Sequence, residues 1–183
     1  MLVSRTLSEL QEVEDTIRAG GGIASSIECD VTDAGQVGAT IGQLDRIDVL
    51  FNGAGINIPE PFLNVTEDHF DQTMSLNVKA AFVVSQTAVR RMRATGSGGV
   101  IINISSQMGH VGAPNRTVYC TSKHAMEGMT KAMAVELAPD NIRVNSIAPT
   151  FILTPMTEPF FEDQEFRKDT IDRIPLGHIG ELE

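Results

Sequence analysis

The sequence has 183 residues, about the size of one domain, of which 42% are hydrophobic and 21% are charged. This composition excludes a disordered polar chain, a collagen-like repeat and a coiled coil. The net charge of −10 argues against nucleic acid and anionic membrane surfaces as partners, because both would repel the protein.

The pattern along the chain predicts helices that alternate with short apolar strands. Helices are predicted over residues 7–19, 34–44, 66–93 and 117–138, and strands over 23–31, 47–52, 100–104 and 142–147. Residues 149–183 are rich in proline and predict loops with short helices. Apolar strands without alternation, separated by helices, are typical of a parallel sheet covered on both faces. We therefore expect an α/β fold with a doubly wound, Rossmann-like sheet in three αβα layers.

Polar clusters follow three of the predicted strands, at residues 52–55, 103–106 and 149–154. In an open parallel sheet, ligands bind beyond the carboxyl ends of the strands, so chemistry is expected at these clusters. Between the second and third clusters, Tyr119 and Lys123 are four residues apart and share one face of a predicted helix. An ammonium beside a phenol favours the phenolate, so the pair predicts a lowered pKa for Tyr119 and a general acid/base.

Six motifs, in order along the chain, closely resemble the short-chain dehydrogenase/reductase family. They are DVTD at 30–33, NGAG at 52–55, LNV at 76–78, INISS at 102–106, YCTSK at 119–123 and IRVNSIAP at 142–149. The resemblance extends from about residue 3 to residue 180. It implies a Rossmann-like fold and an oxidoreductase that transfers hydride between a nicotinamide cofactor and a carbonyl or secondary alcohol.

The resemblance implies four catalytic residues. Tyr119 would exchange a proton with the substrate oxygen, and Lys123 would be its pKa partner and a ligand of the nicotinamide ribose. Ser106 would hydrogen-bond the substrate oxygen. Asn77 would hold a water that relays protons to Lys123, with a backbone bond in a helix kink as the alternative. No metal site is expected, because the four histidines show no metal-binding spacing.

The resemblance also implies a set of cofactor-binding positions. Asp30 and Val31 would hold the adenine ring, although Asp30 also suits a turn. Thr154 would bind the nicotinamide carboxamide, although it also suits an ordinary loop. The full set comprises Tyr119 and Lys123 together with Asp30, Val31, Asn52, Ala54, Gly55, Pro149, Ile152 and Thr154.

Ser4 and Arg5 bear on the choice of nicotinamide cofactor. A carboxylate at the end of the second strand of this fold binds a ribose 2′-hydroxyl and selects NAD, whereas arginine accommodates a 2′-phosphate. Here Ser4 stands where NAD-selecting members of the family tend to have Asp, and Arg5 follows it. We therefore expect NADP(H) to be favoured over NAD(H).

Two parts of the family pattern are missing from the sequence. No TGxxxGxG phosphate-binding turn is present, and the glycines at 20–22 follow a helix rather than a strand. We expect one incomplete domain over residues 1–183, without the first βα unit (roughly 30 residues) and without the last helix and strand. A partial sequence is one explanation. The other is a truncated, catalytically silent fragment that cannot bind cofactor normally.

Two segments are expected to form the substrate side of the site. Residues 107–116 contain His110, Asn115 and Arg116, which suit a sugar, polyol or hydroxy acid. A substrate loop at about 150–176 adds apolar side chains that also suit a β-ketoacyl chain: Phe151, Met156, Phe160 and Phe161. The sequence leaves both substrate classes open.

The expected partners are a small carbonyl or alcohol substrate and further copies of this chain. Family members form dimers or tetramers through helices that correspond to residues 66–93 and 119–138. A stripe of small and Met residues on the second helix fits such a face, and core packing explains it equally well. Because the sequence shows no membrane span or signal peptide, and its two cysteines form no metal or redox motif, we expect a cytoplasmic protein.

Overall fold

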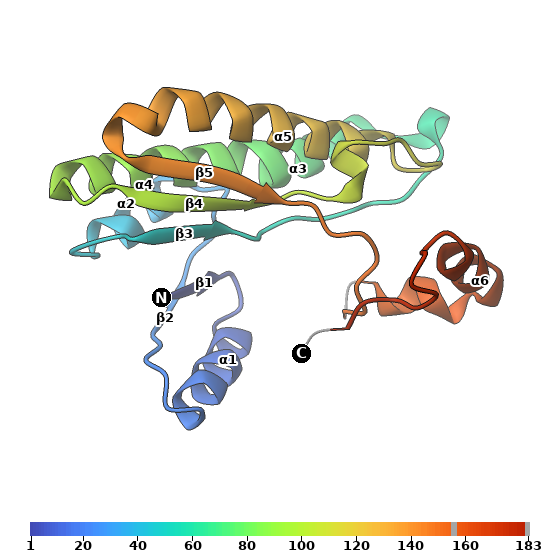
Figure 1. Ribbon diagram of the computed structural model, residues 1–183, viewed down its shortest axis with the longest axis horizontal. Helices are drawn as coiled ribbons and strands as arrows, with labels where there is room; N and C mark the ends of the chain where they lie inside the picture. Colours follow the sequence, from blue (N-terminus) through green and yellow to red (C-terminus); the bar gives the residue numbers. More distant parts are fainter. Residues whose placement is uncertain (155–156, 182–183) are drawn as a thin grey trace. The chain divides into compact units, whose positions relative to one another are not determined.

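Parallel strands and the helices that connect them make up the first of two compact units, residues 1–148, and residues 149–183 make up the second (Figure 1). The computed structural model describes residues 1–154 and 157–181. In this part of the chain, no helix is long and apolar enough to cross a membrane.

The strands of the first unit form two parallel sheets with the orders β1-β2 and β3-β4-β5. Their bounds are β1 (Leu2–Ser4), β2 (Ser26–Glu28), β3 (Val49–Asn52), β4 (Gly99–Ile104) and β5 (Ile142–Ile147). In the larger sheet, Val49 pairs with Val100 and Gly99 with Ile142. The predicted parallel pairing is confirmed. β2 is shorter than expected because β1 offers it partners for only three residues.

Helices follow the strands, as the periodicity predicts. They are α1 (Leu7–Ala19), α2 (Ala34–Gly42), α3 (Glu67–Met74), the π-helical turn η2 (Ser75–Ala80), α4 (Ala81–Thr95) and α5 (Thr117–Leu137), with short 3₁₀ turns at Phe62–Asn64, Gln107–Gly109 and Ala138–Asp140. Side chains cap the starts of α2 and α3: Asp33 accepts from Gly35 N at 2.7 Å, and Thr66 accepts from His69 N at 3.1 Å. The helix expected as continuous over 66–93 is interrupted by η2, which separates α3 from α4.

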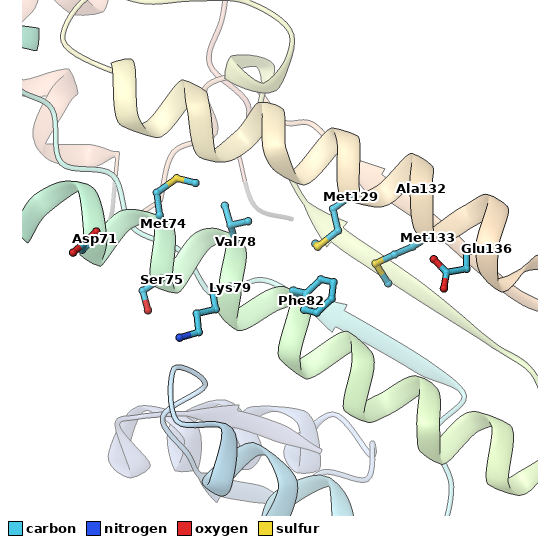
Figure 2. A pocket seen from close by; sticks show the side chains of 10 residues that line it. All are labelled: Asp71, Met74, Ser75, Val78, Lys79, Phe82, Met129, Ala132, Met133 and Glu136. Atoms are coloured by element: carbon cyan, nitrogen blue, oxygen red, sulfur yellow. The ribbon is translucent and has the colours of Figure 1, made fainter. Parts of the chain in front are cut away.

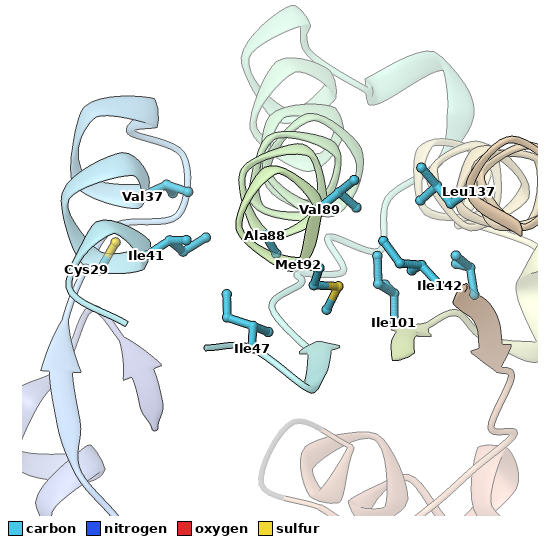
Figure 3. Close-up of a cluster of buried hydrophobic side chains, with 11 residues drawn as sticks. Cys29, Val37, Ile41, Ile47, Ala88, Val89, Met92, Ile101, Leu137 and Ile142 are labelled. Carbon is cyan, nitrogen blue, oxygen red and sulfur yellow. The ribbon is translucent and has the colours of Figure 1, made fainter. Parts of the chain in front are cut away.

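The hydrophobic core of the first unit lies between the larger sheet and its helices (Figure 3). Met92 of α4 and Ile101 of β4 are completely buried at its centre. Val37 and Ile41 extend the core from α2, and Ile142 extends it from β5. α4 and α5 lie along the sheet and cover this face (Figure 1).

The opposite face of the larger sheet is partly open. Side chains of a strand alternate between its two faces. Val49 and Phe51 of β3 are each 58% exposed, and Ile147 of β5 is 48% exposed. The described residues therefore leave apolar surface uncovered on this face, in contrast to the expectation that both faces are covered.

The second unit is held together by phenylalanine side chains. It contains a 3₁₀ turn at Glu158–Glu162 and helix α6 (Gln164–Asp172). The ring of Phe151 lies 5.8 Å from that of Phe161 and 5.6 Å from that of Phe166, and Phe161 is buried. Two of the phenylalanines expected in the substrate loop therefore pack against each other. Met156, expected there as well, lies outside the described residues.

Candidate active site

Tyr119 and Lys123 lie on one face of α5, as their spacing predicts. The Lys123 Nζ is 5.6 Å from the centre of the Tyr119 ring. It donates a hydrogen bond to the Ile104 carbonyl, 2.8 Å away at the end of β4. Only 5% of Lys123 is exposed, so this carbonyl holds an ammonium that has lost most of its water.

Ser106 completes the group of three. It follows β4 in the chain, and its hydroxyl accepts from Met108 N at 3.1 Å, which begins the 3₁₀ turn Gln107–Gly109. Ser106 also lies close enough to the Tyr119 phenol to lower its pKa. The structure thus brings together a hydroxyl, a phenol and an ammonium that are separated by up to 17 positions in the chain.

Burial shifts the pKa values of the phenol and the ammonium in opposite directions. Burial raises the pKa of Tyr119, and the opposing effects of the Ser106 hydrogen bond and the Arg116 charge are smaller. Burial also lowers the pKa of Lys123 to about 8. The expectation that Lys123 lowers the pKa of Tyr119 is therefore wrong for this structure. The Lys123 ammonium donates its hydrogen bond to the Ile104 carbonyl, and desolvation has the largest effect on the pKa of the Tyr119 phenol.

Asn77 is completely buried within the π-helical turn η2. Its Oδ1 accepts from Ile56 N at 2.8 Å, and its Nδ2 donates to Ile56 O at 2.9 Å and to Ser122 Oγ at 3.0 Å. These bonds join η2 to the segment after β3 and to α5, and π-helical turns of this kind are frequent at functional sites. The backbone bond in a helix irregularity is therefore present, and the water relay to Lys123 stays a prediction.

Gly55 lets the chain pass close to this cluster. A Cβ at this position would lie 3.2 Å from Asn77 Oδ1 and 3.8 Å from Lys123 Nζ. The segment after β3 therefore approaches the two side chains more closely than a larger residue would allow.

A buried amide network supports the site and was missed from the sequence. Asn52 Nδ2 donates to Ser85 Oγ and to Asn103 Oδ1, both at 2.9 Å. Asn103 Nδ2 donates in turn to Thr130 Oγ1, also at 2.9 Å. The network joins β3 and β4 to α4 and α5, so it occupies the side chain of Asn52, and contact of the Asn52 backbone with a ribose stays a prediction. Polar residues within otherwise apolar segments were the available signal.

Glu127 is a second group that sequence reasoning missed. It lies four residues after Lys123 on α5 and is 6% exposed. Its Oε2 accepts from Ser146 Oγ at 3.0 Å, and its Oε1 is 3.5 Å from His110 Nε2. A Cβ on Gly109 would lie 3.1 Å from Glu127 Cγ, so the turn after Ser106 packs directly on this carboxylate. His110, expected beside the substrate, thus lies next to a buried carboxyl group.

Most of the expected cofactor positions in the first unit line one groove of about 610 Å³. The groove is lined along β1 and β3 and includes Ser4, Arg5, Val31, Asn52, Ala54 and Gly55. This volume is within the range of small-molecule and cofactor sites. Ser4 Oγ accepts from Thr6 N at 3.1 Å, which leaves its hydroxyl hydrogen available for a ligand.

Asp30 shows the turn geometry that was its alternative role. Its Oδ1 accepts from Thr32 Oγ1 at 2.7 Å and from Thr32 N at 2.9 Å. These two bonds hold the pKa of Asp30 below its usual value, and the charge of Arg5 adds a smaller effect in the same direction. Contact of Asp30 with an adenine ring stays a prediction.

The residues present fit parts of a nicotinamide dinucleotide. Ser4 and Arg5 suit a ribose phosphate, the backbone at residues 52–55 suits a ribose, and Lys123 suits the ribose next to the nicotinamide. Within residues 1–154 and 157–181, no glycine-rich turn joins a strand to a helix in the way that pyrophosphate binding needs. The residues present therefore suit the two ribose-containing ends of the cofactor but not its central pyrophosphate.

The remaining expected positions, Pro149, Ile152 and Thr154, lie in the second unit. Thr154 N donates to Thr157 Oγ1 at 2.9 Å, and Thr157 Oγ1 donates to Ile152 O at 2.6 Å. Ile152 forms an isolated parallel bridge with Gly180. These bonds define a local turn, and contact of the three residues with a cofactor stays a prediction. In the part of the chain that the structure describes, no group of three or more His, Cys, Asp or Glu could hold a metal ion.

Comparison with known families decides the class of this site. The sequence profile described as short chain dehydrogenase matches residues 1–165. The chain belongs to the short-chain dehydrogenase/reductase family. This short-chain dehydrogenase is accordingly an enzyme, an oxidoreductase of carbonyl and alcohol groups with a Rossmann-like fold.

Three relatives show how far the similarity extends. L-xylulose reductase of Bos taurus is 39% identical over 181 residues, which cover 99% of this short-chain dehydrogenase and 72% of the relative. The gluconate 5-dehydrogenase of Burkholderia cenocepacia J2315, solved in complex with NADP and tartrate, has a TM-score of 0.92 at 29% identity, with 98% of this chain and 72% of that one covered. NAD⁺-bound xylitol dehydrogenase has a TM-score of 0.93 at 31% identity, with 98% and 76% covered.

Proposed function

We propose that the protein is an NADP(H)-dependent reductase of small polyhydroxylated ketones, and a dehydrogenase of the corresponding alcohols. The observation that carries this proposal is the Tyr119 phenol, with Ser106 near enough to influence its pKa and the Lys123 ammonium 5.6 Å from its ring. The Ser106 hydroxyl and the Tyr119 phenol carry one O–H each, so together they provide two donors for a single carbonyl oxygen.

Each side chain of the site has a distinct role in the reaction. Because burial raises its pKa, Tyr119 keeps its proton at neutral pH and can donate it to the oxygen of a ketone. Ser106 stabilises the charge that develops on that oxygen. Lys123 holds the ribose next to the nicotinamide, which supplies the hydride when bound. Glu127 keeps the turn after Ser106 in place.

Two observations support a sugar, polyol or sugar acid as the substrate class. The relatives described above are named for xylulose, gluconate and xylitol, which are all polyhydroxylated. In addition, two of the phenylalanines that suggested a β-ketoacyl chain pack on each other within the second unit.

Ser4 and Arg5 support NADP(H) as the preferred cofactor. One solved relative contains NADP and another contains NAD⁺, so the family as a whole does not decide the choice. Arg5 is exposed and lines the groove beside Ser4, as a guanidinium that binds a 2′-phosphate would.

Oxidation of NADPH in the presence of L-xylulose, 5-ketogluconate and a β-ketoacyl thioester tests the proposal. We expect turnover with the first two substrates, a preference for NADPH over NADH, and a loss of at least about 100-fold in kcat for Tyr119→Phe. Cys120→Ser, next to Tyr119, is the control and should retain activity. Turnover that survives Tyr119→Phe would refute the role of the phenol.

A second candidate function is a catalytically silent member of the family that does not bind cofactor. The groove at the expected cofactor positions, open between two separate sheets, is the observation in its favour. Isothermal titration with NADPH separates the two candidates. Saturable binding supports the reductase, and absence of both binding and turnover supports the silent protein.

We also propose that two copies of the chain associate through α4 and α5. A groove of about 820 Å³ has α5 on one side and α3, η2 and the start of α4 on the other, with Phe82, Met129 and Met133 along it and Lys79 and Glu136 at its edge (Figure 2). Phe82 is 50% exposed, and Val135 is 80% exposed on α5. Apolar side chains at this density on two adjacent helices are typical of a surface covered by a partner.

A further inference from the structure

Glu127 places a carboxyl group in the interior of the first unit, close to the catalytic residues. The side chain is 6% exposed and lies four residues after Lys123 on α5. Its Oε2 accepts a hydrogen bond from Ser146 Oγ of β5 at 3.0 Å, and its Oε1 lies 3.5 Å from His110 Nε2. A leucine would fill this place without the cost of burying a carboxyl group. We therefore expect the carboxyl group to have a role beyond packing.

The turn that carries Ser106 packs directly against Glu127. Gly109 ends this turn, and a Cβ at that position would lie 3.1 Å from Glu127 Cγ and 3.0 Å from the Lys123 carbonyl oxygen. These separations are shorter than the best contact distance of a carbon atom, so a residue with a side chain would push the turn away from α5. Glycine therefore lets the turn lie directly on the helix, beside Glu127.

The same turn holds Ser106. The Ser106 Oγ accepts a hydrogen bond from Met108 N at 3.1 Å, and its carbonyl oxygen accepts one from Gly109 N at 2.8 Å. His110 follows directly and is the residue that faces Glu127 Oε1. The turn is thus bonded to Ser106 at its start and lies against Glu127 at its end. Any shift of its end would move the Ser106 hydroxyl.

Two buried polar atoms beside Gly109 have no hydrogen-bond partner among the described residues. They are Ser105 Oγ and Glu127 Oε1. Ser105 is 2% exposed, and its Oγ would lie 2.7 Å from a Cβ on Gly109, so Ser105 and Glu127 lie against the same glycine. Unpartnered buried polar atoms are rare in folded proteins, and such departures are expected mainly at functional sites. They support a functional role for the contact between this turn and α5.

We propose that Glu127 is a positioning residue, whose carboxyl group, bonded to Ser146 and facing His110, fixes the turn after Ser106 and so places the Ser106 hydroxyl at the substrate oxygen. This inference rests on the proposed reductase function. Glu127 acts through Ser106, which stabilises charge that develops only during the reaction. Its loss should therefore lower kcat and leave the KM for NADPH almost unchanged.

Amide exchange measured by NMR tests the geometry without any turnover. Glu127→Leu removes the acceptor of the Ser146 hydrogen bond and the group that faces His110. We expect exchange at the Met108 amide to become at least about tenfold faster, because a shifted turn loses the bond from Met108 N to Ser106 Oγ. Glu12→Leu is the matched control, since Glu12 is exposed on α1, and it should leave exchange at Met108 unchanged.

Steady-state kinetics test the consequence for the reaction. In Glu127→Leu, kcat should fall at least about tenfold while the KM for NADPH stays within about twofold, because a small displacement of a catalytic group is enough to slow the chemistry. Glu127→Gln should keep kcat within about threefold of the parent, since its amide oxygen can still accept from Ser146. In a Ser106→Ala background, Glu127→Leu should have no further effect, because the hydroxyl that it positions is absent.

Ser146→Ala is a second variant, which does not depend on whether Glu127→Leu folds. It removes the donor to Glu127 Oε2 from the side of β5. Exchange at Met108 should again be faster and kcat lower, both by smaller factors than in Glu127→Leu. Far-UV circular dichroism checks that each variant is folded.

Three results would overturn the proposal. The first is exchange at Met108 that is the same in both variants and in the parent. The second is a loss of kcat in Glu127→Leu that persists in the Ser106→Ala background, because Glu127 would then act on another group. The third is an equal loss of kcat in Glu127→Gln and Glu127→Leu. A parent protein without turnover would contradict the proposed function alone, and exchange at Met108 would still decide whether Glu127 fixes the turn.

Discussion

At the scale of single residues, burial rather than charge pairing controls the site. It raises the pKa of Tyr119 and lowers that of Lys123, so both groups favour their neutral forms. The buried ammonium of Lys123 donates a hydrogen bond to the Ile104 carbonyl, and burial is what lowers its pKa. Such a cation costs the folded state free energy, and this cost depends on pH.

Lys123→Met should therefore stabilise the protein at neutral pH. A pKa of about 8 in the folded state, against an ordinary value of 10.5, means that the cost is fully present below pH 8 and disappears as the pH rises toward 10.5. The expected gain at pH 7 is on the order of 3 kcal/mol, and it should shrink markedly at pH 9.5. Urea unfolding at both pH values measures it.

Lys131→Met is the control for this prediction. Lys131 lies on the same helix but is exposed, so its substitution should change the free energy of unfolding by less than about 0.5 kcal/mol at either pH. A gain for Lys123→Met that is the same at pH 7 and pH 9.5 would show that packing rather than charge is responsible.

At the scale of elements, the buried amide network joins two strands to two helices. Asn103→Ala should destabilise the protein by about 2–4 kcal/mol, because it leaves an amide hydrogen of Asn52 and the Thr130 hydroxyl without their buried partner. Asn145→Ala on the adjacent strand β5 is the control, since Asn145 is exposed. Chemical denaturation compares the two, and equal effects would contradict the role of the network.

Elements whose signals are local could be predicted from the sequence. The bounds of α1 and β5 match the predicted 7–19 and 142–147, because apolar periodicity and flanking glycine or proline suffice to define them. The interruption of the helix expected over 66–93 could not be predicted. The partners of Asn77 there are Ile56 and Ser122, which are 21 and 45 positions away in the sequence.

The same distinction holds for the candidate site. Ser106, Tyr119 and Lys123 could be identified because they lie within recognisable motifs, and the structure brings them together. Glu127 was missed, because its partners Ser146 and His110 come from other elements. The direction of the Tyr119 pKa shift was wrong because spacing on a helix says nothing about desolvation.

At the scale of the whole molecule, the surface of α4 and α5 predicts the assembly state. Phe82→Asp should weaken self-association by at least about tenfold, because it places a charge among apolar side chains that a second copy would bury. Sedimentation velocity over a range of concentrations measures this, and Phe62→Asp should behave as the parent protein. A parent protein that is monomeric at all concentrations would contradict the proposed interface.

Fold class was predictable at this scale, whereas the division of the sheet was not. Alternating strands and helices indicate a Rossmann-like fold, and the solved relatives confirm it. Which strands pair depends on contacts across the chain, and β1-β2 stays apart from β3-β4-β5.

Tyr119 is the only tyrosine of the sequence, which contains no tryptophan. Its absorbance and fluorescence are therefore free of background from any other phenol or indole. Light absorbed by this one ring reports directly on its protonation, on ligands that approach it and on loss of its surroundings during unfolding. Tyr119, the residue proposed to transfer the proton, is therefore also an intrinsic spectroscopic probe of its own site.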